Sequence, residues 1–504
     1  MLERILFGLL ALALMFAVTV LYLGLFQPLL DWYHSRETQT ALTAYWLVQG
    51  GPIFAYETPV VGFPWSIPYE FPIYQIIVAI LSSAGIPLDP AGRIVSFAFF
   101  LGCLWPLRVL LRALQFPPVT FPCVAIIFVL SPIYLYWGRA FMIETCALFF
   151  CFTWFAYLAR YLNGPRPVSA VIAAVAGTLG ILAKSTTFPA FGMLGGILLL
   201  KQFFAPQKAG LATGRLRIIV SAAAVIAIPF IIGIIWTAYS DMVKLENEIG
   251  RHLTSRALAL FNFGTLDQRV GLTLWRDVIW QRSLSDAFGY GPAPALALIA
   301  ATLLRREYAY AAGATILGFL TPFLVFTNLH FNHTYYQTAN AIFIIAAAGL
   351  GLSHLMSIRY GRVIAFAFLA WIVSAQLLYF RSTYLHSVTG DATGDSEYRI
   401  SKVVRQTTEP NTSLIVLGAD WDSTIPYYAE RKSMVIPYWM PPTFFQQVFA
   451  TPQTFLDGVP LGGIVYCVDA RSSLEHKALV DAFIAGRAIV GRAGECTLLA
   501  PKKS

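Results

Sequence analysis

Ionisable side chains gather in a short stretch that directly follows the first apolar segment of the chain. The stretch reads DWYHSRETQTA and places Asp31, His34, Arg36 and Glu37 close together. A carboxylate in such a place can take a proton from an attacking hydroxyl or amine, and a positioned general base typically contributes about 10²–10⁴-fold to a rate. A segment that only tethers a chain needs no such groups. Asp31 and Glu37 are therefore candidate proton acceptors.

Further polar residues lie near the ends of later apolar segments. Arg139 and Glu144 occur together in YLYWGRAFMIETC, and Lys184 ends the run in ILAKSTTFPAF. Ionisable groups near bilayer depth cost at least a few kcal/mol each and usually line a cavity or pathway. The other candidates for binding a polar or anionic substrate are Glu70, His330, His333, Tyr336, Arg251, Arg256 and Arg269.

Each of these residues also has a purely structural interpretation. Arg139 and Glu144 could pair at the entrance of a helix, and Lys184 could extend its ammonium group to the membrane surface. His330 and His333 could belong to an aromatic belt or to a zinc site, but such a site lacks a clear third ligand, so we assign no metal ligands. The functional interpretation depends on the joint placement of these groups on one side of the membrane.

The composition is that of a polytopic membrane protein. Of 504 residues, 57% are hydrophobic and 12% are charged, with a mean hydropathy of +0.65, whereas soluble proteins carry about 25% charged residues. The net charge of +9 fits Lys and Arg held on the cytoplasmic side better than nucleic-acid binding. The first apolar run has no small-residue cleavage site, so we expect a retained first span.

Apolar runs of spanning length recur up to residue 380. They cover 5–26, 93–113, 117–134, 145–161, 168–184, 187–201, 216–237, 292–304, 308–327, 338–356 and 363–380. We assume that 68–85 lies at the interface without crossing and that the N-terminus is cytoplasmic. The loops on the cytoplasmic side then contain most of the basic residues that connect the apolar runs. These are Arg108, Arg112, Arg160, Arg166, Lys201, Lys208, Arg215, Arg217, Arg305, Arg306, Arg359 and Arg362. The bias predicts about eleven transmembrane helices.

The chain is predicted to contain two domains. Residues 1–380 form the membrane domain, with large outer loops at 27–92 and 238–291, and residues 381–504 have the composition of a soluble domain. In the latter, SLIVLGAD and GGIVYCVDA predict buried strands and SSLEHKALVDAFIAG predicts a helix, which indicates a small α/β domain. Cys467 and Cys496 could pair only in an oxidising compartment. The remaining cysteines, predicted to be packing residues, are Cys103, Cys123, Cys146 and Cys151.

The order of several motifs resembles the polyprenyl-phosphate-sugar glycosyltransferases of the GT-C type, such as protein O-mannosyltransferases and lipid A aminoarabinose transferases. The motifs are DWYHSRETQTA, PYEFPIYQIIVAIL, GRIVSF, SPIYLYWGRAFMIETCALFF and LAKSTTF, followed by the soluble tail. The resemblance covers most of residues 1–360 and implies a GT-C fold. It also implies transfer of a sugar from a polyprenyl phosphate to an acceptor lipid, glycan or protein on the outer face.

The resemblance implies roles for individual residues. An acid of the first outer loop is the general base in such families, which carries over best onto Asp31, with Glu37 as the rival. The Arg…Asp pair of the second outer loop maps onto Arg139 and Glu144. Where the aminoarabinose transferases have Glu-Lys-Pro-Pro, this chain has Phe71 after Glu70, so the resemblance does not specify aminoarabinose as the donor sugar.

We therefore expect an inverting glycosyltransferase of the bacterial inner membrane, with its active site and C-terminal domain on the periplasmic side. One or two cationic side chains suffice for a leaving monophosphate, so we expect no cofactor and require no divalent metal. Three other classes stay open. One is a protein that binds a sugar phosphate without catalysing a reaction. A lipid-linked sugar flippase or secondary transporter would place ionisable residues in broken helices, often within inverted repeats. A glycan polymerase or ligase would require a lipid diphosphate donor.

Overall fold

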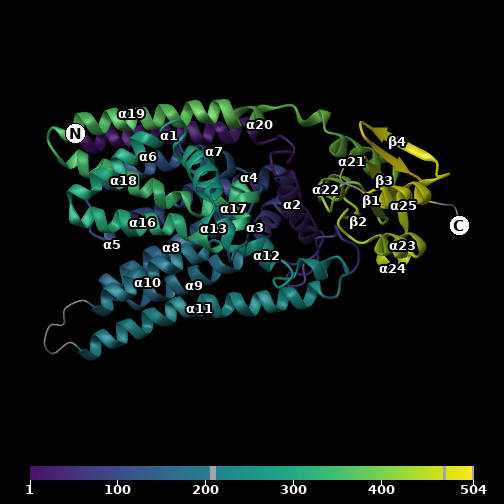
Figure 1. The fold of residues 1–504 in the computed structure, drawn as a ribbon, viewed down its shortest axis with the longest axis horizontal. Coiled ribbons are helices and arrows are strands. Elements are labelled where there is room, and N and C mark those ends of the chain that lie inside the picture. Colours follow the sequence, from purple (N-terminus) through teal and green to yellow (C-terminus); the bar gives the residue numbers. More distant parts are fainter. Residues whose placement is uncertain (205–211, 469–472, 502–504) are drawn as a thin grey trace. The chain divides into compact units, whose positions relative to one another are not determined.

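The computed structural model describes residues 1–204, 212–468 and 473–501. The chain divides into two compact units (Figure 1). Unit 1 comprises Met1–Phe26, Arg93–Trp236 and Ala259–Thr389, and unit 2 comprises Gln27–Gly92, Thr237–Leu258 and Gly390–Ser504. The predicted domains 1–380 and 381–504 stay a prediction, and the structure groups the predicted outer loop 27–92 with the C-terminal residues.

Unit 1 is helical in the residues that the structure describes. Its longer helices are α1 (Leu2–Gly24), α5 (Leu104–Ala113), α6 (Thr120–Val129), α8 (Glu144–Asn163), α9 (Pro167–Ala183), α10 (Phe188–Phe204), α15 (Pro292–Ala301), α16 (Arg306–Val325), α18 (Ala341–Ser357) and α19 (Gly361–Tyr379). Its short elements are α7 (Pro132–Trp137), α12 (Ala259–Phe263), α13 (Leu266–Val270), η2 (Leu274–Ser283), α14 (Leu284–Phe288), η3 (Thr302–Leu304), α17 (Thr327–Asn332), η4 (Thr334–Ala339), η5 (Phe380–Tyr384) and α20 (Leu385–Thr389). Two helices have residues in both units, α4 (Leu88–Gly102) and α11 (Ala212–Lys244).

Six helices of the described residues are long and apolar enough to cross a membrane. A seventh span is added if Leu274–Phe288 and Pro292–Leu304, which meet at 89°, count as one broken span. Several other predicted spans form apolar helices of 10–17 residues, so the count of about eleven stays a prediction. The segment 68–85 contains only the 11-residue α3 (Ile73–Ser83), whose length of about 16 Å is half of a bilayer core.

Close packing of α8, α9 and α10 sets the local geometry of unit 1. Trp154 of α8 is fully buried, and a Cβ added at Gly177 of α9 or Gly195 of α10 would lie 2.4–2.5 Å from its ring. The Trp154 indole also donates a hydrogen bond to the carbonyl of Val225 on α11, with a donor–acceptor distance of 3.1 Å. Small residues therefore let the helix backbones approach closely around one large side chain.

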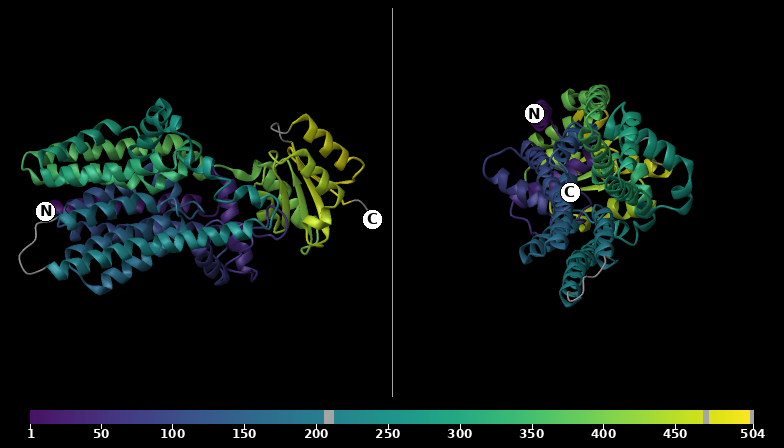
Figure 2. Two further views of the ribbon diagram at one scale, coloured as in Figure 1. Left: turned by 60° about the horizontal axis from the view of Figure 1, so that its bottom comes forward. Right: turned by 90° about the vertical axis from the view of Figure 1, so that its left-hand side faces the viewer.

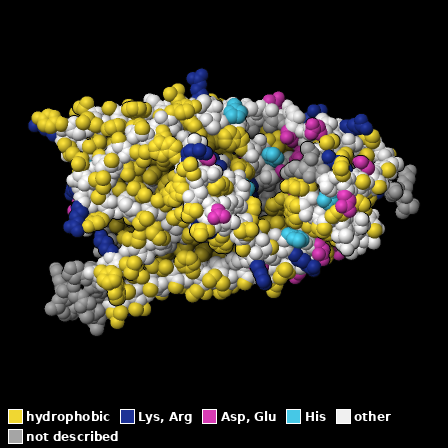
Figure 3. All heavy atoms as spheres, in the orientation of Figure 1, with side chains coloured by type: hydrophobic (Ala, Val, Ile, Leu, Met, Phe, Trp, Pro, Cys, Tyr) yellow, Lys and Arg dark blue, Asp and Glu magenta, His cyan; other side chains and the backbone are white. Residues whose placement is uncertain are grey.

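The surface of unit 1 is that of a membrane protein. Apolar side chains cover most of its visible face, and Lys and Arg side chains lie near the end at which α1 begins (Figure 3). Exposed apolar residues recur along the spans, for example Leu12, Val220 and Ile234. Of the basic residues predicted for the inner loops, Lys208 lies outside the described residues, as does the side chain of Arg215.

Unit 2 combines helices of residues 27–92 and 237–258 with a five-stranded sheet and its helices (Figure 2). Its helices are α2 (His34–Val48), α3, η1 (Gly250–Leu253), η6 (Ala392–Gly394), α21 (Ser396–Thr407), α22 (Thr424–Ala429), α23 (Pro442–Ala450), α24 (Pro452–Phe455) and α25 (Leu474–Ile484). Its strands are β1 (Ser413–Leu417), β2 (Lys432–Ile436), β3 (Leu461–Cys467), β4 (Ile489–Ala493) and β5 (Cys496–Leu499). The strand order is β2-β1-β3-β5-β4, with β2, β1 and β3 parallel and β5 antiparallel to both β3 and β4.

The sequence patterns of the C-terminal residues are confirmed. The two apolar runs form β1 and β3, and the Ser473 side chain caps α25 by accepting a hydrogen bond from the backbone of His476. Gly418 ends β1 with a φ of +85°, and a Cβ there would lie 1.9 Å from the carbonyl oxygen of Cys467, so only glycine fits. Cys467 and Cys496 form a disulfide across β3 and β5, and the other four cysteines are buried.

Candidate functional site

A buried ion pair is the most distinctive polar feature of unit 1. The Lys184 ammonium donates a short hydrogen bond to Oε1 of Glu144, and both side chains are at most 4% exposed. The other carboxylate oxygen, Glu144 Oε2, is buried and accepts no hydrogen bond from the residues that the structure describes. Because a buried carboxylate oxygen prefers to be hydrogen-bonded, this atom is free to accept one from a substrate hydroxyl or amine.

Helix ends bring these two side chains together. Glu144 is the first residue of α8, and Lys184 directly follows α9, where the backbone becomes extended. The α8 and α9 helices pack along their length, with Gly180 so close to Cys151 that a Cβ would lie 2.8 Å from its sulfur. A carboxylate in the first turn of a helix is also favoured by the helix dipole. The sequence indicated both residues but not that they would pair.

Two tyrosine rings cover the ammonium group of Lys184. Its Nζ lies 3.9 Å from the ring centroid of Tyr336 and 5.0 Å from that of Tyr335, within the range of cation–π attraction. Both tyrosines lie in η4, which the hydroxyl of Tyr134 fixes by donating to the carbonyl of Thr338 at 2.7 Å. The predicted residues Glu144, Lys184 and Tyr336 therefore form one cluster, which also includes Tyr335. We call these four residues the Glu144–Lys184 cluster.

The two predicted histidines lie beside this cluster. The ring centroids of His330 and His333 are 6.2 Å and 5.8 Å from that of Tyr336. Burial, together with the positive charges of Arg282 and Lys184, lowers the pKa of His330 to about 3. His330 is therefore neutral at pH 7, and its buried Nδ1 has no hydrogen-bond partner among the described residues.

Arg139 is a buried cation in the turn before α8. It is 1% exposed, and its guanidinium carbon lies 5.1 Å from the ring centroid of Tyr136. A Cβ added at Gly24, the last residue of α1, would lie 3.0 Å from Arg139 Nη1, so the glycine leaves room for the guanidinium group. Hydrogen bonds between Ser96 and the carbonyl of Met142, and between Thr145 and the carbonyl of Ser96, tie this turn to α4.

Sequence reasoning missed one buried acid of unit 1. Asp286 on α14 is 2% exposed, and its Oδ1 accepts hydrogen bonds from the hydroxyls of Tyr384 at 2.7 Å and Tyr379 at 3.3 Å. Asp286 lies in SLSDAFGYGP, and no motif in this stretch singled it out as a candidate site residue. Its contacts join α14 to the end of α19 and to η5, which indicates a structural role.

In unit 2, the candidate bases lie around the start of α2. Asp31 is 5% exposed and Glu37, in the first turn of α2, is fully buried. The backbone N–H of His34 donates to the carbonyl of Asp31 at 3.0 Å, which fixes the turn that enters α2. The segment that follows Asp31 forms α2, and its residues Ala41 and Leu42 are buried in the protein.

A polar hollow lies beside α2 in unit 2. Arg36 forms an ion pair with Glu70 at 2.7 Å and donates to the amide oxygen of Gln39 at 2.6 Å. The hollow encloses about 240 Å³ including its open mouth, and its lining residues are Arg36, Gln39, Thr40, Thr43, Tyr56, Thr58, Ile67, Tyr69, Glu70 and Gln75. Lys244, a buried cation that the sequence did not indicate, lies 4.6 Å from the ring centroid of Tyr69.

Three predicted anion-binding arginines do not gather in one cluster of either unit. In unit 2, Arg251 is 53% exposed and pairs with Glu248 at 3.2 Å, and Arg256 is exposed. In unit 1, Arg269 donates to the carbonyls of Leu324 and Phe263 at 2.8 Å and 2.7 Å. The contacts of Arg251 and Arg269 are to nearby residues and to backbone carbonyls.

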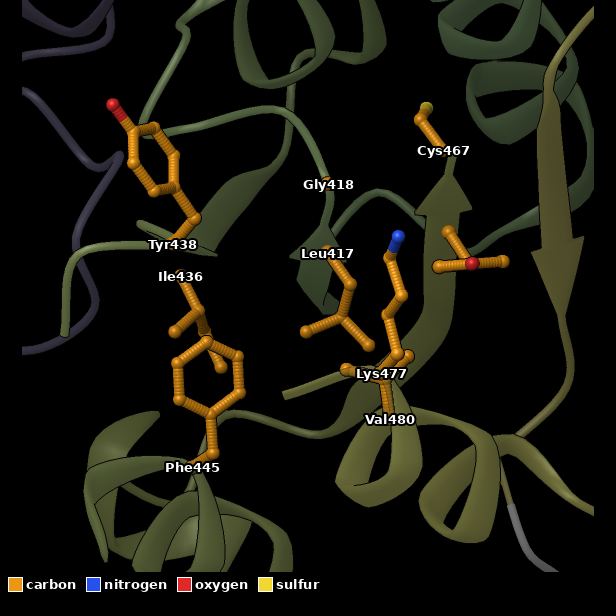
Figure 4. Close-up of a pocket in the computed structure, with 9 residues that line it drawn as sticks. Leu417, Gly418, Ile436, Tyr438, Phe445, Cys467, Lys477 and Val480 are labelled. Carbon is orange, nitrogen blue, oxygen red and sulfur yellow. The ribbon is translucent and has the colours of Figure 1, made fainter. Parts of the chain in front are cut away.

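A second hollow lies in the α/β part of unit 2, at the carboxyl ends of β1, β2 and β3 (Figure 4). Ligands of open α/β sheets often bind at this edge. The labelled side chains include Lys477 and Tyr438 among mainly apolar neighbours such as Leu417 and Phe445. Together with the hydroxyl of Tyr466, these two are the polar side chains of its lining, and they do not form a charged cluster.

Comparison with known proteins gives matches only to solved structures. No protein-family model and no curated protein matches the sequence. ArnT from Cupriavidus metallidurans bound to undecaprenyl phosphate matches with a TM-score of 0.64 and 14% identity over 98% of both chains. The Archaeoglobus fulgidus oligosaccharyltransferase in complex with Zn and sulfate matches with a TM-score of 0.57 and 13% identity, over 91% of this chain and 68% of that one.

The arabinofuranosyltransferase AftD from Mycobacteria also matches, with a TM-score of 0.53 and 14% identity over 97% of this chain and 41% of that one. These three proteins are GT-C glycosyltransferases. The likeness extends over nearly the whole chain and agrees with the apolar spans and the small sheet. The predicted fold class is therefore confirmed: the chain has the GT-C fold.

Proposed function

We propose that this chain, which has the GT-C fold, is an integral-membrane glycosyltransferase that moves a sugar from a polyprenyl phosphate to an acceptor hydroxyl or amine. The Glu144–Lys184 cluster carries the proposal. It combines a buried ammonium, a carboxylate oxygen that is free to accept a hydrogen bond, and two aromatic rings. These groups match a phosphate, a sugar hydroxyl and the apolar face of a sugar ring, respectively.

The donor class follows from the charge that develops in the reaction. When the anomeric carbon leaves the lipid phosphate, negative charge grows on that phosphate, and a fixed cation lowers the barrier. Lys184 can supply that cation, with Arg139 as a second group of the same charge, so the step does not require a divalent metal. The matching ArnT structure is bound to undecaprenyl phosphate, which supports a polyprenyl phosphate as the donor lipid.

The acceptor must lose a proton as it attacks. We assign this proton to Asp31, with Glu37 as the alternative base, because both carboxylates are buried at the start of α2. A single attack on the anomeric carbon, opposite to the leaving phosphate, inverts its configuration. The polar hollow lined by Arg36 and Glu70 is a candidate site for polar groups of the acceptor or of the sugar.

We place the reaction on the outer face of a bacterial inner membrane. The basic residues of the predicted inner loops support this orientation. The Cys467–Cys496 disulfide supports it as well, because disulfides persist in oxidising compartments such as the periplasm.

The test is the transfer of radiolabelled sugar from polyprenyl-phosphate donors to cell-envelope acceptors by the purified full-length protein. We expect Asp31→Asn to lose about 10²–10⁴-fold in rate, and the exposed-acid control Asp267→Asn to keep the wild-type rate. Thermal unfolding in the same detergent identifies variants that still fold.

Each other outcome has a definite meaning. Full activity of folded Asp31→Asn with loss in Glu37→Gln transfers the role of the base to Glu37. A requirement for a lipid diphosphate donor would instead identify a polymerase or ligase. Movement of lipid across sealed vesicles without sugar transfer would identify a flippase and overturn the proposal.

A further inference from the structure

Three side chains with metal-binding atoms converge within unit 2. His34 is the first residue of α2, Glu397 lies in the first turn of α21, and Asp422 lies just before α22. One ligand atom of each lies within 4.8 Å of the other two, and all three side chains are half-buried. The α2 and α22 helices are more than 350 residues apart in sequence but pack against each other, and α22 also packs against α21.

The distances suit a small tetrahedral cation. Nε2 of His34 lies 3.3 Å from Oδ2 of Asp422. In a tetrahedral zinc site with bonds of about 2.0–2.1 Å, neighbouring ligand atoms are about 3.3 Å apart. The two separations that involve Glu397 are each at most 4.8 Å.

Hydrogen bonds from neighbouring backbone groups hold two acids of this region in place. Asp422 uses Oδ1 to accept from the backbone N–H of Thr424 at 2.7 Å, so its Oδ2 is the oxygen that faces His34. Asp395 caps α21 by accepting from the backbone N–H of Tyr398 at 2.8 Å, and thereby fixes the helix end that carries Glu397. Supporting bonds of this kind orient the ligands of metal sites.

The charge around His34 is negative. Asp422 places Oδ2 at 3.3 Å from Nε2 of His34, and Glu397 offers a ligand oxygen within 4.8 Å of the other two ligand atoms. These neighbours of the imidazole are carboxylates. Such an environment attracts a cation, whether that cation is a proton or a metal ion.

We propose that His34, Glu397 and Asp422 bind a divalent transition-metal ion of the Zn²⁺ class, with a water molecule as the fourth ligand. One imidazole and two carboxylates are a ligand set that zinc accepts, whereas magnesium and calcium prefer oxygen ligands alone. The bound ion joins the start of α2 to α21 and α22. The ion is assigned the role of a clip between these elements and no step of the sugar transfer.

The bound ion would affect the candidate bases, which lie next to His34. Asp31, the proposed base, is linked to His34 through the backbone hydrogen bond that opens α2. An ion on His34 would therefore order the segment from 31 to 37, which contains both candidate bases. Metal binding itself does not depend on the proposed glycosyl transfer, so its test stands or fails on its own.

The test uses the full-length protein in detergent, purified through a tag without histidine and stripped of metal. Zn²⁺ binding is measured by titration calorimetry, and the visible absorption of bound Co²⁺ reports the tetrahedral geometry. We expect one ion per wild-type chain. His34→Gln and Asp422→Asn should each weaken binding at least about tenfold, while the exposed-histidine control His386→Gln binds as wild type does.

Two results would overturn the site. If wild-type protein binds neither Zn²⁺ nor Co²⁺, the cluster holds only the ion pair between His34 and Asp422. If His34→Gln binds as tightly as wild type, the ion lies elsewhere. Glu397→Gln serves as a third variant if one of the others does not fold, and Mg²⁺ should not compete with Zn²⁺.

Discussion

Replacement of Lys184 by methionine tests the Glu144–Lys184 cluster most directly. The change keeps the length and apolar stem of the side chain but leaves the Glu144 carboxylate buried without its cation. Removing one partner of a buried ion pair typically costs about 3–5 kcal/mol. At about 2.1 cal/mol/K of unfolding entropy per residue, 504 residues give about 1 kcal/mol/K, so Tm should fall by about 3–5 °C.

A double variant separates stability from activity. Lys184→Met combined with Glu144→Gln removes both charges, and we expect it to regain most of the lost Tm because no buried charge is left unpaired. It should not regain sugar transfer, because the cation for the leaving phosphate is still absent. The assays are thermal unfolding in detergent and transfer of radiolabelled sugar at saturating donor.

Two results would contradict these roles of Lys184. If Lys184→Met unfolds at the wild-type temperature, loss of the ammonium group does not leave an uncompensated buried charge on Glu144. If the stable double variant transfers sugar at the wild-type rate, Lys184 does not act on the donor phosphate.

Two further predictions concern His330 and the disulfide. Below pH 6.5 the unfolded chain protonates His330, whereas the folded chain does so only near pH 3. The free energy of unfolding should therefore fall by up to about 1.4 kcal/mol per pH unit as the pH is lowered from 6.5. His330→Gln should flatten this part of the Tm–pH profile, and an unchanged slope would contradict it. Cys467→Ser opens a loop with a sequence separation of 29 and should cost about 3–4 kcal/mol. Faster proteolysis of residues 390–504 is the readout, and wild-type resistance would show that the disulfide does not form.

The sequence determined what depends on local pattern and composition. Apolar runs identified the long membrane helices, because a bilayer core requires about 20 apolar residues in a row. Alternation between apolar runs and turn residues identified β1, β3 and the Ser473-capped α25. The ordered motifs also identified Glu144 and Lys184 as polar residues at the ends of apolar segments, and they predicted the GT-C fold that the comparisons confirm.

Only the tertiary structure decided which of these residues meet. The pairing of Glu144 with Lys184 depends on the packing of α8 against α9, and the contact of Lys184 with Tyr336 depends on η4, more than 150 residues later. The meeting of His34 with Glu397 and Asp422 depends on contacts across more than 350 residues. Periodicity reports which side of an element is apolar, but it contains no information about the distance between two elements, because that distance is set by the packing of the whole unit.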